Sequence, residues 1–129
     1  MDNNPNYIRK KTILFMNTDL EESTSISFLL KEADFSTLSV ASPAELKKKM
    51  REAPFTAVII DLDSVAVDNR TIKDLALQFP TISFLFVSKE RFHPELKDSI
   101  RDYVYACLTK PIDSEELNYW LKSIQEDKA

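Results

Sequence analysis

The sequence predicts an α/β fold in which a five-stranded parallel sheet is doubly wound, with five helices distributed over its two faces. Short apolar runs alternate with amphipathic stretches along the chain, and this alternation is typical of right-handed βαβ units. The clearest run, residues 55–61, is apolar on both faces and predicts a central strand covered from both sides. It ends in Asp61, at the edge where open α/β sheets bind their ligands.

The remaining elements follow from the spacing of apolar residues. Strands are expected at residues 12–16, 35–41, 55–61, 81–87 and 105–108. The helices between them place apolar residues on one face. In chain order these residues are Ile26, Leu29, Leu30 and Ala33; Leu46 and Met50; Ile72, Leu75, Ala76 and Phe79; Pro94, Leu96, Ile100 and Val104; and Leu117, Trp120, Leu121 and Ile124. Ser42 and Asp113 are predicted to be N-caps of the second and fifth helices.

Length and composition indicate one domain. With 129 residues and 43% hydrophobic content, the chain can bury its own core. We expect the domain to span residues 11–129, and the polar residues 1–10 to form a disordered leader. Cys107 is the only cysteine and no signal peptide is recognisable, so a cytoplasmic location is expected. No apolar run approaches the ~20 residues of a membrane span, and no membrane association is expected.

Composition also argues against several kinds of site. The net charge is −4 and the basic residues are scattered, so no nucleic-acid surface is expected. The absence of glycine excludes Gly-rich phosphate loops, because they need a backbone that no side chain shields. His93, the only histidine, is expected to be exposed in a polar loop, and no transition-metal site is expected. Cys107 is expected to be a small buried core residue.

Polar residues at the ends of three strands suggest a chemistry. Asp61, Ser88 and Lys110 each follow an apolar run, so a parallel sheet would bring a carboxylate, a hydroxyl and an ammonium to one edge. A carboxylate can act as a nucleophile, while the hydroxyl donates a hydrogen bond and the ammonium neutralises charge. This set suits phosphoryl transfer, in which positioning and charge neutralisation supply most of the catalysis.

At these residues the chain resembles a response-regulator receiver domain of two-component systems, over residues 11–125. The phosphoacceptor strand of that family corresponds to Val58–Asp61, its conserved hydroxyl to Ser88, and its Lys-Pro pair to Lys110-Pro111. The resemblance implies the flavodoxin-like (CheY-like) fold with strand order 2-1-3-4-5. It also implies phosphorelay signal transduction, in which Asp61 is the phosphoacceptor and Ser88 and Lys110 assist it.

The chain departs from this family at its metal site. Receivers usually carry two adjacent acidic residues after the first strand, whereas this chain has Asn17 and Thr18, followed by Asp19. Because Mg²⁺ needs charged oxygen ligands to compensate its dehydration, we expect at most a weak Mg²⁺ site at Asp61, Asp19 and Asp63, and no other cofactor. Cys107 also replaces the family's aromatic switch residue on the fifth strand.

Three functional readings follow. In the first, a histidine kinase phosphorylates Asp61 of a working receiver. In the second, the chain is a pseudo-receiver that binds other signalling proteins without phosphorylation; neither reading makes it an enzyme in its own right. The third, a haloacid-dehalogenase-like phosphatase, is suggested by the run from Asp61 to Val65, but that family carries its nucleophile on the first strand. The resemblance also implies possible homodimerisation through the fourth helix, fifth strand and fifth helix.

Overall fold

A computed structural model of the chain describes residues 11–127. Its five strands form one sheet in the order β2-β1-β3-β4-β5, and every neighbouring pair is parallel. The strands are β1 (Thr12–Met16), β2 (Ser36–Val40), β3 (Ala57–Asp61), β4 (Ser83–Ser88) and β5 (Val104–Thr109). The predicted fold class and strand order are therefore confirmed. The expected leader, residues 1–10, lies outside the described residues, and the domain boundary stays a prediction.

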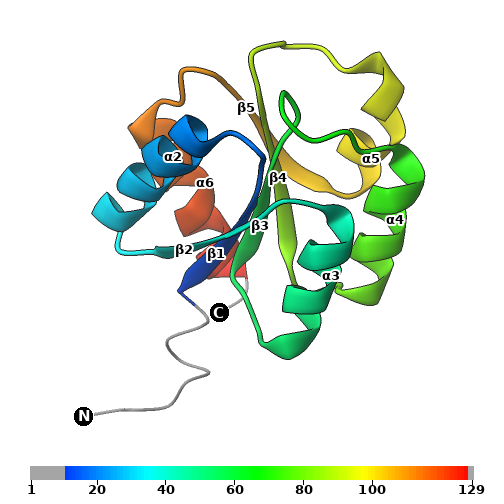
Figure 1. Ribbon diagram of the computed structural model, residues 1–129, viewed down its shortest axis with the longest axis horizontal. Coiled ribbons are helices and arrows are strands. Elements are labelled where there is room, and N and C mark those ends of the chain that lie inside the picture. The colour runs from blue at the N-terminus through cyan, green and yellow to red at the C-terminus, as the bar shows by residue number, and fades with distance from the viewer. Residues whose placement is uncertain (1–10, 128–129) are drawn as a thin grey trace.

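Helices cover both faces of the sheet, as a doubly wound fold requires. They are α2 (Leu20–Glu32), α3 (Pro43–Glu52), α4 (Asn69–Gln78), α5 (Lys97–Asp102) and α6 (Ser114–Asp127), and a 3₁₀ turn, η1 (Pro94–Leu96), precedes α5. In Figure 1, α2 and α6 lie on one side of the sheet and α3, α4 and α5 on the other. No helix within residues 11–127 combines the length and the apolar character needed to cross a membrane.

Alternate residues of each strand build two cores. One core contains Leu14, Val58 and Phe84 together with Leu46 of α3 and Ile72 of α4. The second core contains the neighbouring strand residues and the buried faces of α2 and α6. Its members include Ile13, Phe15, Ile59, Leu85, Ile26, Leu30, Leu117, Leu121 and Ile124. All five residues of β3 are buried, because this strand lies at the centre of the sheet and is covered on both sides.

Side-chain caps fix where several helices begin. The Ser42 hydroxyl accepts a hydrogen bond from the backbone N–H of Glu45 at 3.2 Å, and Asp113 Oδ1 accepts one from Glu115 at 2.8 Å. Both predicted N-caps are therefore confirmed. Asp68 caps α4 in the same way, since its short acceptor satisfies one of the N–H groups that lack a partner in a first helical turn.

The fourth predicted helix is wrong in one respect. Val104 was expected on its apolar face, but it is the first residue of β5 and pairs with Phe84 of β4. The helix is short because Tyr103 closes it, donating its backbone N–H to Ser99 O at 2.8 Å. A β-branched residue at the next position is well suited to starting a strand. Only a 3₁₀ turn and six residues of α5 therefore connect the β4 loop to β5.

Candidate functional site

Three strand ends meet at the carboxyl edge of the sheet. Asp61 ends β3 and pairs in register with Val87, while Ser88 ends β4 and pairs with Thr109. Lys110 follows β5, and its Nζ lies 2.8 Å from Asp61 Oδ1. The structure therefore brings the predicted carboxylate and ammonium into direct contact. The Ser88 hydroxyl contacts Asp63 at 3.4 Å, so it is linked to Asp61 through Asp63 and Lys110.

The carboxylate of Asp61 is buried and both of its oxygens accept hydrogen bonds. The residue has no exposed surface. Oδ1 accepts from Lys110 Nζ at 2.8 Å and from the backbone N–H of Asp63 at 3.1 Å, and Oδ2 accepts from the Ser64 hydroxyl at 2.9 Å. A buried charge is tolerable only when it is paired and hydrogen-bonded. Here one ammonium and two neutral donors meet that requirement.

Lys110 is surrounded by carboxylates. Its Nζ lies 2.8 Å from Asp61, 3.0 Å from Asp63 and 3.6 Å from Glu22 of α2, and only 8% of its side chain is exposed. Burial alone would lower the pKa of Lys110, but the hydrogen bonds to Asp61 and Asp63 and the nearby negative charges outweigh burial and raise it. The ammonium therefore stays protonated and acts as the cation of this edge.

Asp63 joins two loops across the edge. Its Oδ1 accepts from the Ser88 hydroxyl at 3.4 Å, and its Oδ2 accepts from the backbone N–H of Lys89 and lies near Lys110 Nζ, both at 3.0 Å. Burial tends to raise the pKa of Asp63. The hydrogen bonds from Lys110 and Lys89 and the Lys110 charge together lower it below its ordinary value of 3.8. Asp63 is therefore an anion that three donors hold in place.

The residues after β1 have structural partners of their own. Asn17 Oδ1 accepts from the backbone N–H of Asp19 at 3.1 Å. The backbone N–H of Thr18 donates to the Ser64 hydroxyl, and the Thr18 hydroxyl donates to Ser64 O, both at 3.0 Å. Asp19 is the N-cap of α2 and accepts from the backbone N–H of Glu21 at 3.0 Å. Thr18 therefore fastens the β1–α2 connection to the loop after β3, while Asn17 and Asp19 stabilise the connection itself and the start of α2.

Solved structures of signalling proteins share this architecture. No protein-family model matches the sequence, and no curated protein matches it significantly. A signal receiver domain of an HD domain-containing protein from Pseudomonas fluorescens Pf-5 superposes with a TM-score of 0.79 at 17% identity, and the match covers 92% of this chain and 97% of that chain. A receiver domain protein from Clostridium thermocellum gives a TM-score of 0.75 at 18% identity, covering 91% and 95%.

The chemotaxis response regulator CheY4 of Vibrio cholerae gives a TM-score of 0.72 at 18% identity, and the match covers 88% of this chain and 97% of that one. The chain has a receiver-domain fold. In this receiver fold, Asp61 ends the central strand β3 and Lys110 follows the edge strand β5, which are the positions that the sequence resemblance assigns to the phosphoacceptor and the conserved lysine.

The edge of this receiver fold does not fit Mg²⁺. Residues 11–127 contain no group of three or more His, Cys, Asp or Glu side chains placed to hold a metal ion. Asp61 and Asp63 share the Lys110 ammonium, and Asp19 caps α2. Because Mg²⁺ needs oxygens whose charge is available to compensate its dehydration, the weak site predicted at Asp61, Asp19 and Asp63 gains no support from this geometry.

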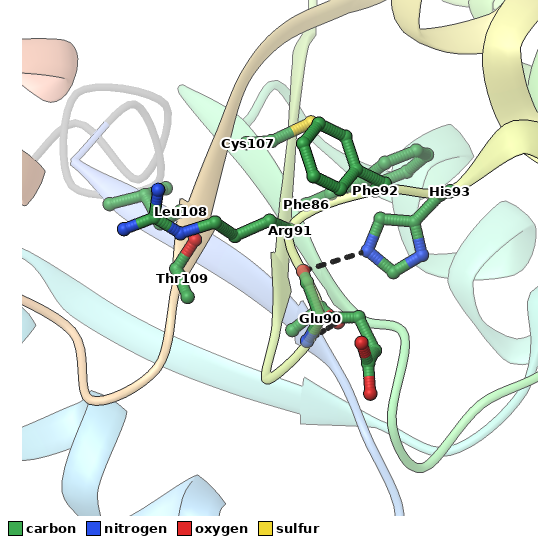
Figure 2. Close-up of a pocket in the computed structure, with 9 residues that line it drawn as sticks. Phe86, Glu90, Arg91, Phe92, His93, Cys107, Leu108 and Thr109 are labelled. Carbon is green, nitrogen blue, oxygen red and sulfur yellow. Dashed lines mark hydrogen bonds between the residues drawn. The ribbon is translucent and has the colours of Figure 1, made fainter.

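A pocket of about 290 Å³ lies beside the site, between the loop after β4 and strand β5 of the receiver fold. Figure 2 shows this pocket, with Arg91, Phe92 and His93 on the loop and Cys107 on the strand. Cys107 is exposed, which corrects the prediction that it is buried. The reason is that β5 is an edge strand and the six-residue α5 leaves this part of its face uncovered.

His93 also departs from the prediction. It was expected to be exposed, but only 10% of its side chain is accessible. Its Nε2 lies 3.1 Å from Glu90 O, an interaction drawn in Figure 2, and its Nδ1 lies 3.7 Å from a carboxylate oxygen of Glu95. Because the loop folds back on itself, the ring lines the pocket of the receiver fold instead of pointing into solvent.

Sequence reasoning missed two side chains and one backbone group of the receiver-fold edge. Ser64 hydrogen-bonds Asp61, Glu22 pairs with Lys110, and the backbone N–H of Lys89 binds Asp63. Ser64 lies three residues after a strand-end aspartate, a spacing at which a turn can bring hydroxyl and carboxylate together. That spacing was an available signal. Glu22 had none, because its contact depends on how α2 packs over the sheet.

Proposed function

We propose that the chain is a signalling module with a receiver fold that binds its partner without phosphoryl transfer to Asp61. The observation that carries this proposal is the state of the Asp61 carboxylate, which is fully buried and whose two oxygens are both engaged. One of these oxygens would have to attack phosphorus to form an aspartyl phosphate. That attack would break existing hydrogen bonds at a site whose carboxylates are not free to hold Mg²⁺.

A working receiver is the second candidate, and the Lys110 contact favours it. In that case an Asp61 oxygen would bond to the phosphorus of a phosphohistidine, and the phosphorus–nitrogen bond would break. The Lys110 ammonium, 2.8 Å from Asp61, would then neutralise the charge that develops on the phosphoryl oxygens. A haloacid-dehalogenase-like phosphatase is disfavoured because Asp61 lies on the third strand along the chain.

Labelling with a small phosphodonor separates these candidates. The full chain is incubated with acetyl phosphate and Mg²⁺, and its intact mass is followed over time beside an Asp61→Asn control. We expect no stoichiometric addition of a phosphoryl group. Rapid addition of one phosphoryl per chain, absent from the Asp61→Asn control, would establish the working receiver and overturn the proposal.

The proposed partner surface consists of α5, β5 and α6. Its aromatic side chains form a cluster in which Trp120 packs edge-on against Tyr105 and Tyr119, with ring centroids 5.9 and 5.0 Å apart. Tyr119 is 62% exposed. Exposed aromatic residues are enriched in protein interfaces, so this face suits a cytoplasmic signalling protein, such as a histidine kinase, or a second copy of the chain.

A further inference from the structure

The sheet has an open edge at β2. This strand is the first in the sheet order, so within residues 11–127 only β1 pairs with it. Ser36 donates its backbone N–H to Lys11 O at 3.0 Å, on the side of β1. Because backbone groups alternate in direction along a strand, the N–H and C=O groups of Thr37 and Ser39 point away from β1. In the described part of the chain no strand pairs with these groups.

This edge lacks the usual protection against a second strand. Natural edge strands commonly carry charged side chains, proline or a bulge, because unpaired backbone groups attract another strand. The β2 sequence STLSV contains no charged residue and no proline, and its register with β1 is continuous. Residues 35–44 as a whole carry no charge, although 29% of the chain is charged. Because the cores of protein interfaces are depleted in charged residues, the composition of this edge suits a contact surface.

The helix next to this edge carries opposite charges at its two ends. Asp19, Ser23, Ser27 and Lys31 recur every four residues, so they share one side of α2. Ser23 Oγ lies 2.7 Å from Ser39 Oγ of β2, which places this side of the helix beside the open edge. Asp19 and Lys31 are both exposed. The two small serines between them allow a neighbouring helix to approach closely, because the distance between packed helices depends on the side chains at the contact.

We propose that a second copy of the chain pairs with this edge, with the two β2 strands antiparallel about a twofold axis at Leu38. In this register Thr37 of one copy lies opposite Ser39 of the other. The two N–H and two C=O groups that each copy turns outward then all form hydrogen bonds. The two Leu38 residues face each other across the axis as a non-hydrogen-bonded pair. No charged residues of β2 oppose each other, so like-charge repulsion does not weaken the pairing.

Charge complementarity on α2 is the reason that the occupant is a second copy. The same twofold axis makes the two α2 helices antiparallel on one face of the combined sheet. The Asp19 end of one helix then lies beside the Lys31 end of the other, and this contact occurs twice in each dimer. The interface is isologous and closes at two chains. The inference goes beyond the proposed function, because it uses neither Asp61 nor the surface of α5, β5 and α6.

Disulfide trapping tests the register. In a Cys107→Ser background, Leu38→Cys places two thiols across the axis, where the Cα atoms of such a pair are about 4.5 Å apart, within the span of a disulfide. Ser39→Cys is the matched control. Ser39 is more exposed than Leu38, but its two copies are diagonal neighbours about 7–8 Å apart. With oxidised glutathione as the oxidant, we expect Leu38→Cys to form a covalent dimer at least about tenfold faster than Ser39→Cys, as measured by intact mass.

A charge reversal tests the dimer without a covalent bond. Lys31→Glu should raise the dissociation constant of the dimer about tenfold, because both contacts with Asp19 become repulsive. Lys73→Glu on α4 is the matched control, since Lys73 is also exposed and the change in charge is the same. The dissociation constant of this control should stay within about twofold of that of the unaltered chain. Sedimentation equilibrium of the full chain measures both values.

Three results would overturn the proposal. The first is equal trapping of Leu38→Cys and Ser39→Cys, which is the outcome expected if copies associate only through α5, β5 and α6. The second is an equal effect of the two charge reversals, and the third is an unaltered chain that stays monomeric. Circular dichroism checks that each variant is folded. If Leu38→Cys does not fold, the comparison of Lys31→Glu with Lys73→Glu still decides.

Discussion

Lys110 Nζ and Asp61 Oδ1 lie 2.8 Å apart although the two residues are 49 positions apart in the sequence. The side chains are only 8% and 1% exposed, so this ion pair is shielded from solvent. Bringing both charges out of water costs a large desolvation penalty, and removal of Lys110 leaves the Asp61 carboxylate without its cation, whereas removal of Asp61 still leaves Lys110 beside Asp63 and Glu22. The pair therefore couples the end of β3 to the residue after β5.

Lys110→Met is expected to lower the free energy of unfolding by about 3–5 kcal/mol, the cost of leaving a buried carboxylate without its cation. Urea denaturation measures this change. In a double-mutant cycle, the double variant Asp61→Asn with Lys110→Met should lose less stability than the sum of the losses in the two single variants. The reason is that the double variant no longer contains the uncompensated carboxylate charge. Strict additivity of the two substitutions would show that the contact contributes nothing to stability.

Acid should weaken the Asp63 contacts selectively. The pKa of Asp63 is lowered in the folded chain from an ordinary value of 3.8. A carboxyl whose pKa is lowered by folding stabilises the fold above its ordinary pKa and loses this contribution as pH falls through the lowered value. The stability difference between the unaltered chain and Asp63→Asn should therefore be constant from pH 7 to about pH 5 and shrink below about pH 4.

Urea denaturation of both proteins at each pH measures this difference. The other carboxylates titrate in both proteins and largely cancel, and Lys110, whose pKa is raised, stays protonated throughout. A difference that remains unchanged down to pH 2.5 would contradict the role assigned to the ionised Asp63 carboxylate.

Asp34 supplies the left-handed backbone that a chain without glycine still needs. It follows α2 with φ at 69°, and its carboxylate pairs with Lys11 at 2.8 Å. Asp34→Asn and Asp34→Ala both remove this exposed ion pair, but asparagine tolerates the left-handed region better than alanine. We expect Asp34→Ala to melt roughly 3–5 °C below Asp34→Asn. Equal melting temperatures in differential scanning calorimetry would show that the backbone conformation carries no cost here.

Sequence periodicity was sufficient to predict which strand ends share an edge. Asp61, Ser88 and Lys110 each follow an apolar run, and a parallel sheet necessarily places such positions together. Periodicity does not determine how loop side chains turn. Asp63 was therefore predicted only as a ligand of a weak Mg²⁺ site, whereas the turn after β3 directs its side chain to Ser88 and Lys110. Cys107 was predicted to be a small buried core residue, but it is exposed because the short α5 leaves its part of β5 uncovered.

The aromatic face should mediate association. Tyr119 on α6 and Leu77 on α4 are both 62% exposed, and their helices lie on opposite sides of the sheet. Leu77 is therefore a control position matched to Tyr119 in exposure. Tyr119→Lys should weaken self-association or partner binding at least about tenfold, because aromatic residues contribute heavily to interfaces. Leu77→Lys should leave self-association and partner binding unchanged. Sedimentation equilibrium of the full chain measures self-association, and equal effects of the two substitutions would argue against a specific α5, β5, α6 interface.

Restoring an acidic pair after β1 should create the metal site that the present edge lacks. Asn17 and Thr18 now hydrogen-bond Asp19 and Ser64, and neither supplies charge. Asn17→Asp with Thr18→Asp places two carboxylates near Asp61, so we expect Mg²⁺ affinity to rise by about tenfold or more, since affinity follows the number of charged ligands.

Calorimetric titration with Mg²⁺ measures this gain. The charge-matched control is Lys47→Gln with Lys48→Gln on α3, which changes the net charge by the same amount far from the edge. An equal rise of Mg²⁺ affinity in the control would show that the gain is nonspecific attraction of the cation to a more negative protein. No rise in either protein would mean that the Lys110 ammonium, held by Asp61 and Asp63, keeps a second cation out even when carboxylates are added.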